Sequence, residues 1–279
     1  MKLAFAKYEG LGNDFVIVDA AALGGHAGRI DAATAMRICD RHLGVGADGV
    51  LVVAAAGDGY TMAVINADGS RAETCGNGLR CVALHLAHHG KVGSDPFTIT
   101  TEAGPHACRV IESGRDGVVE VAMRPASFTP GEVPVDAIAR LVDTSFAIAG
   151  DQVRLTAVSV GNPHAITFDD VGDRRLALGP ALERDARFPE GVNVGFARAL
   201  APDRIDLAVW ERGAGWTRAC GSGACACAVA AVETGRSRRG EPIEVRLPGG
   251  ALRIVVGEPG APVRMTGPAR HVFDGVVEI

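Results

Sequence analysis

The sequence predicts an α+β fold built from two pseudo-symmetric halves, each a curved, mixed β-sheet or barrel-like layer around a central helix. Three observations support this prediction. Short apolar runs alternate with turns rich in glycine, which accounts for 37 of the 279 residues. Only three segments carry a clear helical pattern. An internal repeat relates the first half of the chain to the second.

Apolar runs bounded by turn residues are typical of strands. They cover residues 15–18, 50–53, 61–65, 97–100, 118–123, 165–168, 192–196, 205–209, 243–247 and 252–256. Helical patterns cover 31–42, with Asp31 as the N-cap, and 78–89 and 223–234, each of which a glycine ends. Residues 124–134 hold three prolines and are the best candidate for a linker. We therefore expect a first half over 1–124 and a second half from 125 onward.

The repeat consists of two matching motifs. Gly-Asn followed by an apolar strand occurs at Asn13 and again at Asn162, 149 positions later. Cys-Gly-x-Gly opening a helix occurs at Cys75 and again at Cys220, 145 positions later. The similar offsets predict two homologous halves that face each other, with the active site in the cleft between them.

Composition narrows the class of function. Hydrophobic residues make up 47% of the chain, which excludes a disordered protein. The formal net charge is −5, and the one basic cluster, within 236–239, is too short for a nucleic-acid footprint. Residues 1–12 lack the apolar core of a secretory signal, and no apolar segment reaches the ~20 residues of a membrane span. We expect a cytoplasmic protein with neither nucleic-acid nor membrane partners.

The cysteines do not indicate a structural framework: each thiol is expected to be either reactive on its own or simply buried. Seven is an odd count, and no Cys-x-x-Cys pair is present, so neither closed disulfides nor a metal site is expected. Cys75 and Cys220 each precede a helix, where the helix dipole favours a thiolate. The adjacent glycines let backbone amides hold a carboxylate or a developing oxyanion.

Two thiols on opposite faces of one carbon can invert its configuration. The thiolate removes a proton from one face, and the thiol returns a proton to the other. Pyridoxal phosphate would need a Schiff-base lysine. The chain has only three lysines, Lys2, Lys7 and Lys91, and none lies in a phosphate-binding glycine context. The sequence therefore favours a reaction without a cofactor.

Several long motifs resemble the diaminopimelate epimerase family. Asn66-Ala-Asp-Gly-Ser70 with Cys75-Gly-Asn-Gly-Leu-Arg80 is similar to the first family motif, and residues 211–224 are similar to the second. Gly10-Leu-Gly-Asn-Asp-Phe15, Gly161-Asn-Pro-His164 and Met265-Thr-Gly-Pro-Ala269 fit the same family. The resemblance thus spans nearly the whole chain. It implies epimerisation of LL- to meso-2,6-diaminopimelate without a cofactor, in a homodimer whose residues 266–279 return to the first half, leaving 125–265 as the second.

The resemblance also assigns roles to residues. It implies that Cys75 and Cys220 are the two bases, and that His164 and Glu211 modulate their pKa values. The implied substrate-binding residues are Asn13, Asn66, Gly76, Asn77, Asn162, Asn193, Glu211, Arg212, Gly221 and Ser222. One position departs from the pattern: Gly49 stands where some family members carry a glutamine, so it is left out of the site.

Two alternatives stay open at this point. A proline racemase-like or phenazine-pathway-like isomerase would share the fold, but a substrate with a second ammonium and carboxylate accounts better for Glu211, Arg212 and Asn193. A thiol-based redox or metal-binding protein would instead work through a disulfide or bound zinc, without proton exchange.

Overall fold

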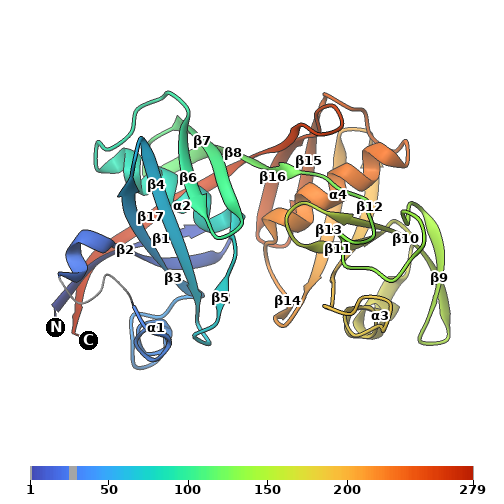
Figure 1. Cartoon of the computed structure of the whole chain (residues 1–279), viewed down its shortest axis with the longest axis horizontal. Coiled ribbons are helices and arrows are strands. Elements are labelled where there is room, and N and C mark those ends of the chain that lie inside the picture. Colours follow the sequence, from blue (N-terminus) through green and yellow to red (C-terminus); the bar gives the residue numbers. More distant parts are fainter. Residues whose placement is uncertain (1, 25–29, 279) are drawn as a thin grey trace. The chain divides into compact units, whose positions relative to one another are not determined.

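The structure is a computed structural model that describes residues 2–24 and 30–278. The chain divides into two compact units, one formed by Met1–Ala122 with Thr266–Ile279 and the other by Met123–Met265. Strands β8 (Asp116–Pro125) and β17 (Pro262–Glu278) carry the chain from one unit to the other (Figure 1).

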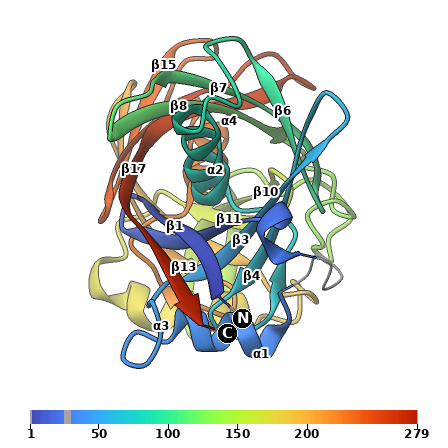
Figure 2. The same cartoon turned by 90° about the vertical axis from the view of Figure 1, so that its left-hand side faces the viewer.

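The first unit is a curved layer of strands around helix α2 (Gly76–His88) (Figure 2). Its further strands are β1 (Lys2–Gly10), β2 (Asn13–Asp19), β3 (Gly49–Ala56), β4 (Gly59–Asn66), β5 (Arg71–Ala72), β6 (Phe97–Thr101) and β7 (Gly104–Glu112). The pairing order is β1-β2-β3-β4-β6-β7-β8, and β17 pairs with both β8 and β1. These pairings close the layer into a barrel. Two short helices, η1 (Ala20–Leu23) and α1 (Ala32–Cys39), follow β2.

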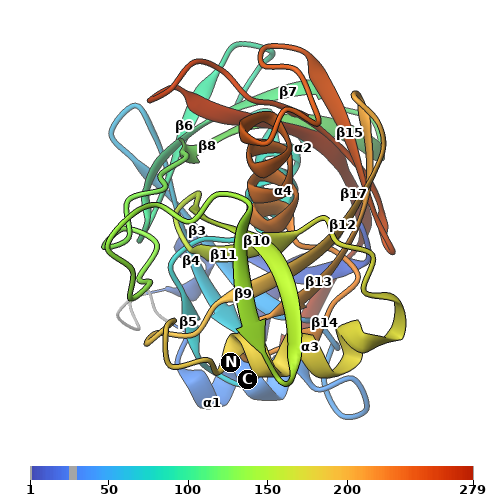
Figure 3. The ribbon, with the colours of Figure 1, turned by 90° about the vertical axis from the view of Figure 1, so that its right-hand side faces the viewer.

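The second unit surrounds helix α4 (Gly221–Glu233) in the same way (Figure 3). Its strands are β9 (Thr144–Ile148), β10 (Asp151–Ser159), β11 (Pro163–Thr167), β12 (Asn193–Ala201), β13 (Arg204–Glu211), β14 (Gly215–Trp216), β15 (Pro242–Leu247) and β16 (Gly250–Val255). Helices η2 (Gly172–Arg174) and α3 (Arg175–Glu183) lie between β11 and β12.

Strand pairing confirms the predicted repeat. From β1 to β7 the successive pairs in the first unit are antiparallel, parallel, antiparallel, parallel and antiparallel. From β10 to β16 the second unit repeats this sequence of pairings. Both units place their long helix between the fourth and fifth of these strands. The α+β class and the two pseudo-symmetric halves are therefore confirmed.

The central helices are buried on every side, which explains their composition. Residues 76–86 of α2 are all buried, and residues 223–231 of α4 consist only of glycine, alanine, cysteine and one valine, all of them buried. A helix that is apolar all round belongs in a core, and small side chains let strands approach it closely. Each helix thus begins at a cysteine held inside its unit.

The structure differs from the sequence prediction at several elements. All ten predicted runs lie in strands to within a residue, but β1, β5, β7, β9, β10, β14 and β17 were not anticipated. The first helix ends at Cys39, not at residue 42: the backbone leaves the helical conformation at Asp40, whose carboxylate accepts from the N–H groups of His42 and Leu43. Helix α3 was missed because it contains Gly179 and Pro180, residues that normally interrupt a helix.

Among the described residues, no helix has both the length and the apolar character that crossing a membrane would require.

Helix α3 provides a matched pair of leucines for a stability test. Leu178 is 1% exposed in the core of the second unit, whereas Leu176, two residues earlier, is 58% exposed. We expect Leu178→Ala to lower the free energy of unfolding by about 2–5 kcal/mol, through lost burial and a residual cavity. Leu176→Ala should change it by less than about 0.5 kcal/mol. Urea denaturation of both variants measures the difference, and equal losses would contradict the packing described here.

Candidate active site

Cys75 and Cys220 occupy the same local structure in the two units. Each is the N-cap of its central helix, with an extended backbone. The sulfur of Cys75 accepts a hydrogen bond from the N–H of Gly78, and that of Cys220 accepts one from Gly223, both at 3.3 Å. A helix N-terminus directs its first N–H groups outward, where they favour an anion. Each unit therefore places a thiol beside a potential carboxylate-binding position at Gly76–Asn77 or Gly221–Ser222.

The glycine three residues after each capping cysteine is closely surrounded. A Cβ atom added to Gly223 would lie 3.1 Å from the sulfur of Cys220 and 3.2 Å from a methyl carbon of Val209. The corresponding atom on Gly78 would lie 3.3 Å from the Cβ of Cys75. A side chain at either position would crowd the capping cysteine. This close packing accounts for the second glycine of each Cys-Gly-x-Gly motif.

Cys220 is held as a protonated thiol. It is only 4% exposed, and its sulfur lies 3.6 Å from the hydroxyl of Ser222. Burial raises the pKa of Cys220 well above its usual value, and the negative charge of Glu211 raises it further. Because the thiol and the Glu211 carboxylate are hydrogen-bonded, the proton stays on sulfur while that carboxylate is charged.

Glu211 is the last residue of β13 and reaches Cys220 from the neighbouring strand end. Burial raises the pKa of Glu211, while hydrogen bonds from Thr217 and Cys220 act in the opposite direction. The Thr217 hydroxyl donates to Oε1 of Glu211. Thr217 was not singled out in the sequence, although it lies within the second motif.

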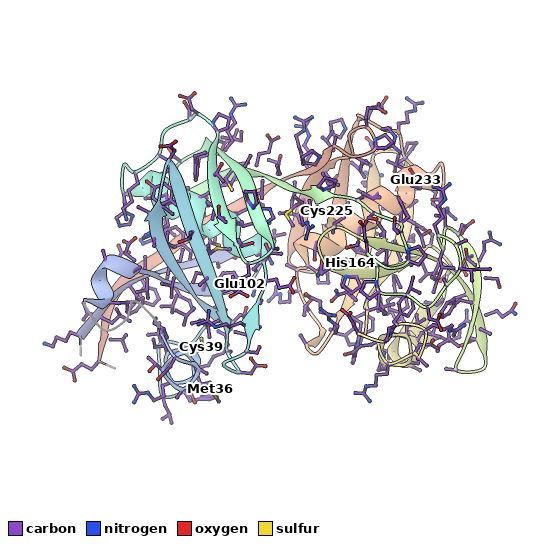
Figure 4. The ribbon with its side chains drawn as sticks, in the orientation of Figure 1. Met36, Cys39, Glu102, His164, Cys225 and Glu233 are labelled. Atoms are coloured by element: carbon purple, nitrogen blue, oxygen red, sulfur yellow. The ribbon has the colours of Figure 1, made fainter. Side chains whose placement is uncertain are left out.

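His164 and Asn162 form a second group around Ser222. The imidazole Nε2 of His164 lies 3.0 Å from Oδ1 of Asn162 and 3.1 Å from the Ser222 hydroxyl, and Nδ2 of Asn162 donates to that hydroxyl at 3.2 Å. His164 is fully buried at the start of β11 (Figure 4). Burial and the nearby charge of Arg212 lower the pKa of His164 to about 3. The ring is therefore neutral at physiological pH and acts here through hydrogen bonds.

In the first unit, two asparagines are linked in a chain of defined direction. Arg80, which is fully buried, donates to Oδ1 of Asn77 at 2.9 Å. Nδ2 of Asn77 donates to Oδ1 of Asn13 at 3.1 Å, and Nδ2 of Asn13 donates to Asp48 at 2.7 Å. An arginine can only donate and an ionised carboxylate can only accept, so the two ends fix the orientation of both amides.

Asp48 is itself anchored by charge. Arg41 bonds Asp48 at 2.7 Å and Asp14 at 2.6 Å, and Lys7 pairs with Asp14 at 2.6 Å. The hydrogen bonds and charges of Arg41 and Lys7 lower the pKa of Asp14 to about 2, against the opposing effect of burial. Sequence reasoning treated Asp48 and Arg80 as structural residues. Only their contacts with Asn13 and Asn77 connect them to the candidate site.

Gly49 and Asn193 occupy equivalent positions in the two units but make different contacts. In the parallel pairing, Gly49 lies opposite Phe15 and Asn193 lies opposite His164. Asn193 is buried; its Oδ1 accepts from the backbone N–H of Arg212 at 3.0 Å and its Nδ2 donates to the carbonyl of Pro163 at 2.8 Å. In the first unit, the N–H of Ala67 bonds the backbone carbonyl of Asp48 instead. Asn193 thus holds the backbone beside Arg212, and Gly49 has no side chain to do so.

The remaining predicted residues lie at strand ends. Asn66 ends β4 and donates through Nδ2 to the Ser70 hydroxyl at 2.9 Å, within its own turn. Arg212 is exposed just after β13, and its Nη1 donates to the carbonyl of Glu190 at 2.9 Å. Across residues 2–24 and 30–278, no group of three or more His, Cys, Asp or Glu side chains is arranged to hold a metal ion.

The family model and the curated relatives agree on one family. The family model described as diaminopimelate epimerase matches residues 5–129 and 156–272. The chain is 44% identical to diaminopimelate epimerase of Synechococcus elongatus, covering 100% of this chain and 99% of the relative. It is also 44% identical to diaminopimelate epimerase of Desulforudis audaxviator, covering 98% of each chain.

A solved structure supports the fold independently. A hydroxyproline epimerase from Agrobacterium vitis superposes with a TM-score of 0.67 at 15% identity, covering 99% of this chain and 92% of that one. At this identity the likeness concerns the fold alone. The family match and the relatives, which extend over nearly the whole sequence, carry the assignment: the chain belongs to the diaminopimelate epimerase family.

Proposed function

We propose that this protein interconverts LL- and meso-2,6-diaminopimelate without a cofactor, using Cys75 and Cys220 as its two bases. The main observation behind the proposal is that a cysteine sulfur caps the central helix of each unit. This chain belongs to the diaminopimelate epimerase family, and each of its two units has one thiol at the N-terminus of a buried helix. The reaction requires these two thiols to reach opposite faces of one α-carbon.

The proton balance needs one thiolate and one thiol at the start. The thiolate removes the α-proton and becomes a thiol, and the other thiol delivers its proton to the opposite face and becomes a thiolate. The carbanion formed between these steps places negative charge on the α-carboxylate. The amides of Gly76–Asn77 and Gly221–Ser222 stabilise that charge at the helix N-termini.

Glu211 links substrate binding to the state of Cys220. In the unliganded protein burial raises the pKa of Cys220, and the Glu211 charge raises it further. A substrate ammonium paired with Glu211 offsets that charge, so the pKa of Cys220 falls when substrate is in place. The thiol becomes a competent base only with its substrate bound.

The distal end of the substrate needs a carboxylate-binding and ammonium-binding surface. Arg212 can hold a carboxylate through two parallel N–H donors. Asn13, Asn66, Asn162 and Asn193 supply amide donors and acceptors near the same strand ends in their respective units. His164 keeps its neutral ring against Ser222, so it supports the amide position after Cys220 without adding charge there.

The lysines support the absence of a Schiff base in this proposal. Lys7 is 6% exposed and paired with Asp14, and Lys91 is paired with Asp19 at 2.8 Å. Two of the three lysines are thus engaged in ion pairs, a contact that competes with a role as the Schiff-base nucleophile.

We further propose a cytoplasmic homodimer, which rests on the family resemblance. The exposed apolar side chains Val272, Phe273 and Val276 near the end of β17 are compatible with a partner surface. Light scattering coupled to gel filtration should give twice the chain mass of 28.7 kDa. A monomer at micromolar concentration would contradict the dimer.

Deuterium incorporation tests the proposed reaction. Reduced protein in D2O, supplied with LL-diaminopimelate and no pyridoxal phosphate, should yield meso product labelled at the α-carbon. Cys75→Ala and Cys220→Ala should each lower the rate of inversion by about 10²–10⁴-fold, because each removes one of the two proton-transfer groups. Chiral chromatography with mass spectrometry measures isomer and label together.

A third cysteine provides the control for that experiment. Cys227 is fully buried on α4 and Cys227→Ala should retain inversion, since the proposal gives this thiol no part in the reaction. A folded, reduced wild type that neither exchanges nor inverts diaminopimelate would overturn the assignment. Proline and hydroxyproline would then be the next substrates to test.

Alkylation of Cys220 tests the electrostatic role of Glu211. Glu211→Gln removes the negative charge that raises the pKa of Cys220, so a larger thiolate fraction should exist at pH 8. Iodoacetamide should then modify Cys220 severalfold faster, and the curve of alkylation rate against pH should shift to lower pH. Mass spectrometry of the Cys220 peptide follows the reaction, with the exposed carboxylate variant Glu258→Gln as control. An unchanged pH profile would show that Glu211 does not set this pKa.

A further inference from the structure

A single carboxylate bridges both sides of the Glu211–Arg212 pair. Glu183 is the last residue of α3, and its Oε2 accepts a hydrogen bond from the indole Nε1 of Trp210 at 2.6 Å. Its Oε1 accepts from the backbone N–H of Gly213 at 2.9 Å. Trp210 and Gly213 are the residues immediately before and after Glu211–Arg212.

The same region of chain restrains Arg212 directly. Beyond its backbone bond to Asn193, its Nη1 donates to the carbonyl of Glu190 at 2.9 Å. Its stem runs beside Gly191, where an added Cβ atom would lie 3.1 Å from the arginine Cδ. The guanidinium is therefore held on one side while its other N–H donors can face a ligand.

Trp210 fixes the turn against α3. A Cβ atom on Gly179 would lie 3.0 Å from Cγ of Trp210, so the indole packs directly on the helix backbone. Trp210 also makes an edge-to-face contact with Trp216 on β14, with ring centroids 5.6 Å apart. The indole joins the helix to both strands of the β13–β14 hairpin, whose turn carries Arg212.

Only an ionised carboxylate satisfies both donors. The hydrogen bonds from Trp210 and Gly213 hold the pKa of Glu183 below its ordinary value, although burial alone would raise it. A glutamine has one carbonyl oxygen and one NH2 group, so in the same place it would direct N–H at one of the two donors. The site thus distinguishes glutamate from its closest isostere.

We propose that Glu183 is a positioning residue for substrate recognition: it holds the Glu211–Arg212 turn so that Arg212 can bind the distal carboxylate. The inference rests on the proposed function, and it adds a residue outside every motif that identified the family. Glu211 has its own partners in Thr217 and Cys220, so loss of Glu183 acts mainly on Arg212.

Steady-state kinetics with LL-diaminopimelate test this role. Glu183→Gln should raise KM about tenfold, as expected for the loss of one charged hydrogen bond, and change kcat less than about threefold. Glu258→Gln, which makes the same charge change in the exposed turn before β17, is the matched control and should leave both constants unchanged. An unchanged KM in Glu183→Gln would overturn the proposal.

A double variant separates positioning from general destabilisation. Trp210→Phe removes the indole donor, so the NH2 group of a glutamine at 183 no longer faces an N–H, and its oxygen can accept from Gly213. Glu183→Gln with Trp210→Phe should therefore bind substrate better than Glu183→Gln alone. A double variant that is worse than both single variants would show a merely structural role and overturn the proposal.

The outcomes also distinguish a failure of this inference from a failure of the proposed function on which it rests. A wild type without activity on LL-diaminopimelate would overturn the proposed function, and this inference with it. An active wild type with either an unchanged KM in Glu183→Gln, or a raised KM that Trp210→Phe does not lower, would overturn the role of Glu183 alone.

Discussion

The hydrogen bond from a helical N–H to a cysteine sulfur is the constraint on which each unit depends. Serine, threonine, aspartate and asparagine are the preferred N-caps, and sulfur is a weak acceptor by comparison. A cysteine cap places a thiol at the positive end of the helix, but it stabilises the helix less. Burial supplies the missing stability, because the barrel surrounds α2 and its counterpart layer surrounds α4. The closed strand layer and the position of the thiol are therefore linked.

The two units repeat one architecture with different electrostatics. The side-chain amides of Asn13 and Asn77 form a hydrogen-bonded chain between Arg80 and Asp48. Arginine can only donate and carboxylate can only accept, so the two ends fix the orientation of both amides. Around Cys220, a carboxylate lies directly against the thiol. The repeat supplies symmetric positions, whereas the proposed reaction needs different groups at the reacting end and the distal end of its substrate. Asn193, which bonds the backbone N–H of Arg212 where the equivalent Gly49 has no side chain, is one position at which the shared backbone carries different groups.

The sequence predicted those features that are local or repeated. Two Cys-Gly-x-Gly motifs before apolar runs were sufficient to place α2, α4 and both thiols, because cap, glycine and helix are adjacent in the chain. Helix α3 escaped prediction because Gly179 and Pro180 oppose helix formation locally, and tertiary packing against Trp210 outweighs that preference. Glu183 carried no signal, since one glutamate at a helix end resembles any solvated residue. Its two partners lie 27 and 30 positions away in the chain.

The burial of Cys220 has a consequence for how fast peroxides oxidise its thiol. Peroxides attack the thiolate, so a thiol that keeps its proton is oxidised slowly. Cys220 is 4% exposed, and the neighbouring Glu211 charge suppresses its ionisation. If the substrate ammonium offsets that charge, the sulfur becomes reactive only when substrate already covers it. Under the proposed function, the Glu211 carboxylate would thus both bind substrate and slow the oxidation of Cys220 in the empty protein.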